Sequence, residues 1–127
     1  MKFKIQTTSY FDSEAKRLGK HYRSFVDDLK SFRDSITKDP FQGTEIMPGI
    51  RKVRMSIETK GKGKSGGARV ITFTYLVSEE SGNVILLLLY DKSDASSIKS
   101  NVVKKIVKDL GFNLEQMQRK GILPKSL

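Results

Sequence analysis

Residues Gly49–Phe73 read GIRKVRMSIETKGKGKSGGARVITF, a stretch that predicts two strands joined by a loop of glycines and lysines. Apolar and polar residues alternate over Val53–Ile57, so one face of the first strand packs on a core while the other displays Lys52 and Arg54. Arg69 opens the second strand. Because neighbouring strands lie about 4.8 Å apart, these basic side chains can converge on one face of a sheet.

Positive charge is concentrated in this stretch. Between Gly49 and Arg69 there are seven basic residues and one acid, Glu58, and the whole chain carries a formal net charge of +10. A clustered excess of this size indicates a polyanionic partner, either a nucleic acid or an acidic protein. A merely basic protein without such a partner is the less favoured alternative, because its charge would be spread more evenly. The seven residues are Arg51, Lys52, Arg54, Lys60, Lys62, Lys64 and Arg69.

The composition limits the class of protein. The chain has 127 residues, which suits one domain, and 37% of them are hydrophobic, which is enough for a single core. It has no cysteine, which excludes disulfides, thiolate nucleophiles and cysteine zinc sites and fits a reducing compartment. The N-terminus does not resemble a signal peptide, and the longest apolar run, Val84–Leu89, is too short for a membrane span. We therefore expect a soluble cytoplasmic protein that does not contact a membrane.

The remaining segments complete an α+β pattern. A strand is predicted at Lys2–Ile5, and apolar steps of three and four from Phe11 to Ile36 predict two helices that form a hairpin, with the break near Gly19. Phe41–Gly49 is predicted as a loop. Further strands follow at 68–77 and 84–90, the last apolar on both faces, and a helix runs from about 98 to 110 with its cap at Asp94, Ser96 or Ser97.

The fold class that we predict is a single α+β domain over residues 1–111, followed by a tail, 112–127, with a weak helical pattern. The domain would contain a small, mainly antiparallel sheet, an N-terminal helical hairpin and a C-terminal helix. We expect all the helices to pack on one face of this sheet.

Several familiar sites are excluded. Gly63-Lys64-Ser65 resembles a nucleotide-binding loop, but that motif requires glycine where Glu58 stands, and a helix where a strand is predicted. The only histidine, His21, lies in the predicted helix–helix loop, which argues against a Ser-His-Asp set or a histidine base. The acids are scattered rather than grouped as ligands, so we predict neither a metal site nor a cofactor.

The cationic cluster is the remaining candidate site. Lys52, Arg54 and Arg69 are joined by Tyr90 and Lys92, which end the third strand of the central segment. Arginine suits bidentate contact with phosphate, lysine supplies a point charge, and a tyrosine can stack on a base or bind a phosphate. The alternative is an ordinary basic strand face, with Tyr90 completing the core. We favour a nucleic-acid-binding surface.

Five segments of the chain resemble a known family. They are FDSEAKRLGKHY at 11–22, the DP-x-x-G pattern at 39–43, PGIRKVRM at 48–55, KGKGKSGGARVI at 60–71 and VILLLLYDKSD at 84–94. Together they resemble the RelE/ParE superfamily of toxins from bacterial toxin–antitoxin modules, most closely the HigB-like branch. The resemblance covers roughly residues 3–110, and the two central segments are its most specific part.

The resemblance implies a RelE-like fold and a ribosome-dependent mRNA endonuclease, an mRNA interferase that inhibits translation by metal-independent attack of a ribose 2′-hydroxyl on the phosphate. Lys52 and Arg54 match strand residues that orient RNA and help to activate the hydroxyl. Arg69 matches an arginine that stabilises the transition state, and Lys92 falls where a basic residue assists the leaving oxygen. The implied partners are the ribosome, mRNA and a HigA-like antitoxin that is acidic or contains a helix-turn-helix. The expected RNA-binding residues are Arg51, Lys60, Lys62, Lys64 and Tyr90.

Two features leave alternatives open. Some relatives use a histidine or a tyrosine of the last helix as acid or base, and this chain has neither there, so Tyr90 or Asp91 would have to substitute. The superfamily also contains gyrase poisons that act by protein contact. A gyrase-poisoning toxin and a non-catalytic RNA-binding module are therefore the alternative functions.

Overall fold

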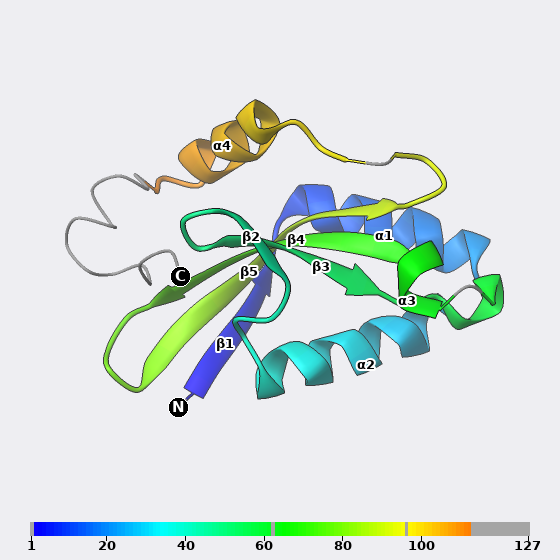
Figure 1. Ribbon diagram of the computed structural model, residues 1–127, viewed down its shortest axis with the longest axis horizontal. Helices are drawn as coiled ribbons and strands as arrows, with labels where there is room; N and C mark the ends of the chain where they lie inside the picture. Colours follow the sequence, from blue (N-terminus) through cyan, green and yellow to red (C-terminus); the bar gives the residue numbers. More distant parts are fainter. Residues whose placement is uncertain (1, 62, 96, 113–127) are drawn as a thin grey trace.

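The computed structural model describes residues 2–61, 63–95 and 97–112, and these residues build one five-stranded sheet with helices on both sides (Figure 1). The strands are ordered β1-β5-β4-β3-β2. β1 runs parallel to β5, and the other neighbours are antiparallel. The strands are β1 (Lys2–Thr7), β2 (Thr44–Met47), β3 (Ile50–Met55), β4 (Ala68–Leu76) and β5 (Ser81–Asp91).

The α+β class and the mainly antiparallel sheet are confirmed, and two long helices precede the central strands as predicted. α1 spans Ser9–His21 and α2 spans Phe25–Lys38. The glycine–lysine segment holds a short 3₁₀-helix, η1 (Glu58–Lys60), and a single turn, α3 (Gly63–Gly66). The last helix, α4, spans Ser100–Asp109.

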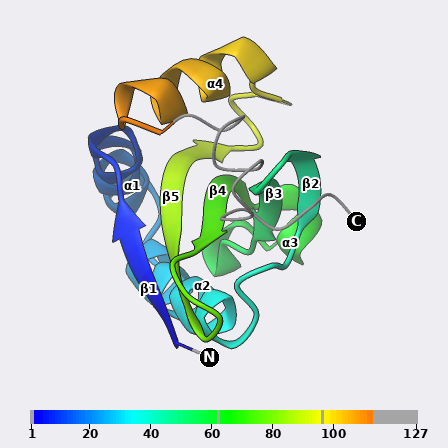
Figure 2. The same ribbon diagram turned by 90° about the vertical axis from the view of Figure 1, so that its left-hand side faces the viewer.

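The expectation that all helices pack on one face of the sheet was wrong. Figure 1 shows α4 above the sheet and α2 below it, and Figure 2 gives the same separation from a second direction. α1 and α2 bury Phe11, Leu18 and Phe32 against one face. α4 buries Val103 and Ile106 against the other. The second face needs this cover because β4 and β5 are apolar on both sides.

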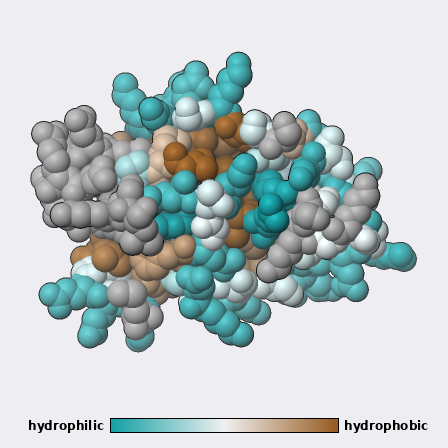
Figure 3. Space-filling view, viewed as in Figure 1, coloured by the Kyte–Doolittle hydropathy of each residue, from teal (hydrophilic) through white to brown (hydrophobic). Residues whose placement is uncertain are grey.

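Hydrophobic side chains also reach the surface beneath α4 (Figure 3). Val102 on this helix is 44% exposed. Phe112, the first residue of the predicted tail, packs edge-on against Phe73, with ring centroids 5.2 Å apart. The predicted tail from 113 onward lies outside the described residues.

Three predicted boundaries were also wrong. Gly19 lies inside α1, which continues to His21 and is followed by the extended Tyr22. The predicted loop at Phe41–Gly49 contains β2, a short edge strand. α4 starts at Ser100 with Lys99 as its N-cap residue, later than the predicted caps at 94–97.

One register shift is important for the site. β4 and β5 pair regularly from Leu76 up to Thr72, which faces Leu86, but the next pair is Ile71 with Leu88. Leu87 is therefore an extra residue in β5, a β-bulge. Beyond it, the side chains of β5 alternate with the opposite parity.

Within the part of the chain that the structure describes, none of the helices has the length and hydrophobicity needed to cross a membrane.

Candidate functional site: a cationic cleft

Four predicted site residues line one cleft of about 490 Å³, here called the cationic cleft. They come from three places in the fold: the end of β3, the start of β4 and the residue after β5. The predicted convergence of these side chains is therefore observed. The described residues that line the cleft are Gln42, Gly43, Thr44, Lys52, Val53, Arg54, Arg69 and Lys92.

Strand register explains the convergence. Arg54 pairs directly with Arg69 across β3 and β4, and Lys52 stands two residues before Arg54 on the same face. Like charges directly opposite one another destabilise a sheet by about 0.2–1 kcal/mol. The described residues that line the cleft include no Asp or Glu. The arrangement is suited to an anion that bridges the two guanidinium groups.

The two arginines differ in how firmly they are held. Arg69 is only 5% exposed, and its Nη1 donates a hydrogen bond to the carbonyl oxygen of Ala68, at 3.1 Å. Arg54 is exposed to solvent. The cleft therefore combines one fixed guanidinium at its inner wall with one at its rim that can adapt to a ligand.

Lys92 is placed by a close approach of the backbone. Its N–H donates to the carbonyl oxygen of Gly67 at 3.1 Å, just beyond the last β4–β5 pair. A Cβ on Gly67 would lie 2.1 Å from the carbonyl oxygen of Met55, so only glycine fits between the two strands. Gly67 thus brings the segment after β5 close to the end of β3 and sets Lys92 at the cleft.

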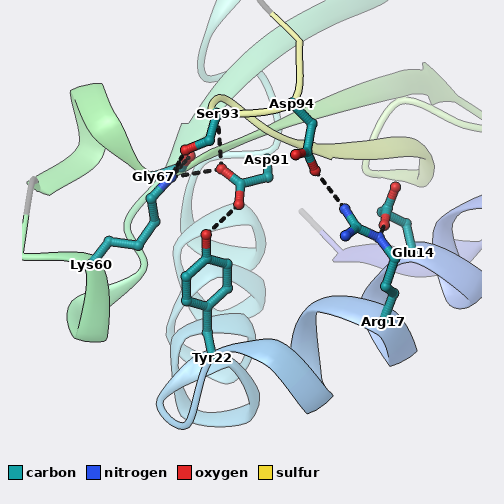
Figure 4. Close-up of polar contacts among 8 residues, drawn as sticks. All are labelled: Glu14, Arg17, Tyr22, Lys60, Gly67, Asp91, Ser93 and Asp94. Atoms are coloured by element: carbon teal, nitrogen blue, oxygen red, sulfur yellow. Dashed lines mark hydrogen bonds and ion pairs between the residues drawn. The ribbon is translucent and has the colours of Figure 1, made fainter.

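Behind the cleft lies a buried network centred on Asp91 (Figure 4). Lys60 and Tyr22 point toward this carboxylate from different elements. The Lys60 Nζ lies 2.6 Å from Asp91 Oδ1 and 2.8 Å from Ser93 Oγ. The Tyr22 hydroxyl donates to Asp91 Oδ2. The side chains of Lys60 and Asp91 are only 7% and 3% exposed.

The network shifts two pKa values. Burial alone would raise the pKa of Asp91, but hydrogen bonds from Lys60, from Tyr22 and from the Ser93 N–H outweigh it and lower the pKa to about 2. The hydrogen bond to Asp91, and then burial, raise the pKa of Tyr22 to about 12. Asp91 is thus held as a carboxylate that anchors the glycine–lysine segment to the end of β5.

This network includes one of the predicted contact residues. We predicted that Lys60 binds RNA, but its ammonium group is engaged with Asp91 and Ser93 and is almost fully buried. The same geometry makes Asp91 an unsuitable substitute for the missing acid or base. It lies on the face of α1 and α2, away from the cleft.

Arg51 also lies away from the cleft. Its side chain is 5% exposed, pairs with Glu45 at 3.3 Å and stacks 5.3 Å from the centre of the Phe41 ring. The alternation of β3 accounts for this, because Arg51 shares the parity of Val53, which packs under α1 and α2. The expectation that Arg51 contacts RNA therefore does not fit its position.

Tyr90 is a neighbour of the cleft rather than part of its lining. It pairs with Arg69 across β4 and β5 but is only 5% exposed. Its hydroxyl is buried without a hydrogen-bond partner among the described residues. Burial raises the pKa of this hydroxyl, and the charge of Arg69 partly opposes that shift. Of the other predicted contacts, Lys62 and the side chain of Lys64 lie outside what the structure describes.

Sequence reasoning missed two residues that line the cleft: Gln42, which precedes β2, and Thr44, the first residue of β2. Gly43 between them has φ of +98°, and a Cβ there would lie 2.6 Å from the carbonyl oxygen of Lys52. Gly43 therefore allows the backbone before β2 to pack directly against β3. Gly43 was visible in the DP-x-x-G pattern, but its contact with Lys52 depends on a strand that was predicted to be a loop.

No model of a known protein family matches the chain.

Proposed function

We propose that this protein is a ribosome-dependent mRNA endonuclease, the toxin of a type II toxin–antitoxin module. The observation that carries the proposal is the pairing of Arg54 with Arg69 in a cleft that Lys52 and Lys92 also line. Four cations around one small opening suit a phosphodiester better than an extended acidic protein surface. The sequence resemblance to HigB-like toxins supplies the reaction and the ribosome as its setting.

The proposed reaction is cleavage by transesterification. The ribose 2′-oxygen attacks the adjacent phosphorus, and the bond from phosphorus to the 5′-oxygen of the next nucleotide breaks. The products are a 2′,3′-cyclic phosphate and a 5′-hydroxyl. One proton must leave the 2′-hydroxyl and one must reach the 5′-oxygen.

The cleft offers a group for each requirement. Arg54 and Arg69 hold the non-bridging oxygens, where negative charge grows in the transition state. Lys52 accepts the proton of the 2′-hydroxyl, which requires its neutral amine, and Lys92 supplies a proton to the 5′-oxygen. Packing of the ribosome around the open cleft would exclude water and strengthen these interactions.

An antitoxin would neutralise the protein by covering the same cleft. Because the described lining residues include four basic side chains and no acid, an acidic segment is the chemistry that fits. Such a segment would compete directly with the RNA phosphate.

The test is primer extension on a defined message in a cell-free translation reaction. Cuts at codon-spaced positions that disappear when ribosomes are omitted are expected. Arg54→Ala and Arg69→Ala should each reduce cleavage by about 100-fold or more, as loss of a transition-state donor does elsewhere. Arg33→Ala, an exposed arginine on α2, is the matched control and should cut normally.

An intact message would refute the endonuclease. Two further assays then separate the alternatives. Gyrase-dependent DNA breaks without loss of message would identify a gyrase poison, and salt-sensitive RNA binding without cleavage would identify an RNA-binding module.

A further inference from the structure

A second cavity, of about 600 Å³, lies on the other side of Arg54, between α2 and the end of β3. It shares Arg54 and Gln42 with the cationic cleft. β2 pairs with β3 only as far as Lys52, so beyond that residue the strand edge is open toward this cavity. A ligand that occupies the cleft can therefore continue around Arg54 into the second cavity.

The chemistry of this cavity differs from that of the cleft. Phe32 and Met55 form part of its wall, and Asp28 and Glu58 bring carboxylates instead of ammonium groups. Two acids disfavour a phosphate here and favour a group that is neutral and donates hydrogen bonds. The volume falls within the usual range of small-molecule sites, about 300–1,000 Å³.

The orientation of one carboxylate is already fixed. Asp28 Oδ2 accepts hydrogen bonds from the Glu58 N–H at 3.0 Å and from the Ser24 hydroxyl at 2.6 Å. These bonds tie α2 to η1 and hold the acidic wall in place before any ligand arrives. Preorganisation of this kind lowers the entropic cost of binding.

We propose that this cavity binds one unpaired guanine of the RNA whose phosphate occupies the cationic cleft. The inference rests on the proposed function, since it assumes that the ligand in the cleft is RNA. A nucleotide joins an anionic phosphate to a neutral base, which matches a cationic cleft beside an acidic, partly apolar cavity. Among the bases, guanine presents two adjacent donors, its ring N1–H and its amino group, as a carboxylate requires.

The test measures binding of the full chain to five-nucleotide RNAs of sequence UUXUU at low salt, where X is guanosine, inosine, uridine or an abasic ribose. All four RNAs have the same phosphates. Guanosine should bind about tenfold more tightly than the abasic RNA, within the usual range for a well-placed base contact. Inosine lacks the amino group and should fall between them.

Two variants examine the cavity itself. Ser31 is exposed on α2 and lines the cavity but not the cleft, so Ser31→Phe should fill the space and abolish the preference for guanosine. Glu58→Gln should weaken the distinction between guanosine and inosine. Ser13→Phe, the same change on the exposed surface of α1, is the matched control and should keep the preference.

The outcomes separate this inference from the proposed function. Equal binding of guanosine and abasic RNA by the unaltered protein, or a preference that survives both Ser31→Phe and Glu58→Gln, would overturn the guanine site even if messages are cleaved on the ribosome. A preference lost in these variants, together with intact messages in translation, would support the site and overturn the endonuclease.

Discussion

Arg54 and Arg69 face each other directly across β3 and β4, so two guanidinium groups leave the sheet side by side on the same face. This pair connects the fold to the proposed chemistry. It costs stability in the free protein and gains it when an anion binds. Stability and activity should therefore respond in opposite directions when one of the two charges is removed.

Arg54→Gln should raise the thermal stability of the free protein while it abolishes cleavage. Relief of the repulsion is worth about 0.2–1 kcal/mol. Thermal denaturation with and without sulfate measures the effect, and sulfate should stabilise the unaltered protein more than the variant. Arg33→Gln on α2 should change neither quantity. A variant less stable than the parent would contradict the view that the pair is strained.

The salt dependence of RNA binding should report how many cations of the cleft contact phosphates. Each phosphate contact on single-stranded nucleic acid contributes about −0.7 to the slope of log K against log salt. Lys52, Arg54, Arg69 and Lys92 together predict a slope of about −2.8, and Arg54→Ala should reduce it to about −2.1. Titrations at several salt concentrations provide the slope. Identical slopes for the variant and its parent would place the bound RNA elsewhere.

Lys52→Arg should separate binding from chemistry. Arginine retains the positive charge but does not lose its proton in proteins, so it cannot act as the proposed base. RNA affinity should stay within about threefold of the parent, while cleavage falls by the 10²–10⁴-fold typical of a lost general base. Binding titrations and primer extension on one preparation measure both. Full cleavage by this variant would remove the proton-accepting role from Lys52.

Asp91 should make the fold sensitive to acid. Its pKa in the folded protein is about 2 and lies below the value of about 3.9 in an unfolded chain, so its contribution to stability is complete above pH about 4 and is lost as the pH falls toward 2. The shift corresponds to about 2–3 kcal/mol. Urea unfolding between pH 2 and 6 measures this change.

The matched variants are Asp91→Asn and Asp94→Asn. Asp91→Asn should be less stable at pH 6, because Lys60 is left buried beside a neutral group, and its stability should vary less over the acid range. Asp94 pairs with Arg17 at the surface, so Asp94→Asn should follow the parent closely. A parental acid response in Asp91→Asn would show that other carboxylates cause it.

Gly67→Ala should damage both the fold and the cleft. The added Cβ would approach the Met55 carbonyl oxygen to 2.1 Å, so the β3 and β4 backbones must separate. Because the Gly67 carbonyl accepts the N–H of Lys92, this movement should also displace Lys92. We expect a loss of at least about 1 kcal/mol in unfolding free energy, with reduced cleavage. Gly61→Ala, where a Cβ meets nothing within 4 Å but φ is +69°, tests backbone strain without the clash.

The alternation of side chains around Lys52 and Arg54 could be predicted from sequence. Successive side chains of a strand point to opposite faces, whichever elements pack against it. The same rule should have removed Arg51 from the predicted RNA contacts, since Arg51 shares the parity of Val53. There, the clustering of charge in the sequence was given more weight than the direction of each side chain.

Other features could not be predicted from local pattern. Lys60 pairs with Asp91, 31 residues away, and only the folded chain brings them together. β2 was missed because Gly43 and Pro48 signal a loop, while the edge strand between them is only four residues long. The position of α4 on the second face follows from β5, which is apolar on both sides. That pattern is visible in the sequence, and it implies that a helix must cover each face of the sheet.

The bulge at Leu87 determines whether the acidic side chain of Asp91 lies on the same face of the sheet as Arg69. With regular alternation along the whole of β5, Asp91 would lie on the face of Arg54 and Arg69, and Tyr90 would turn toward α1 and α2. A carboxylate would then sit next to the arginines and compete with any phosphate for them. The single extra residue instead directs the carboxylate to Lys60 and Tyr22, on the opposite face of the sheet from the two arginines. The one-residue bulge thus determines which charged side chains share a face of the sheet.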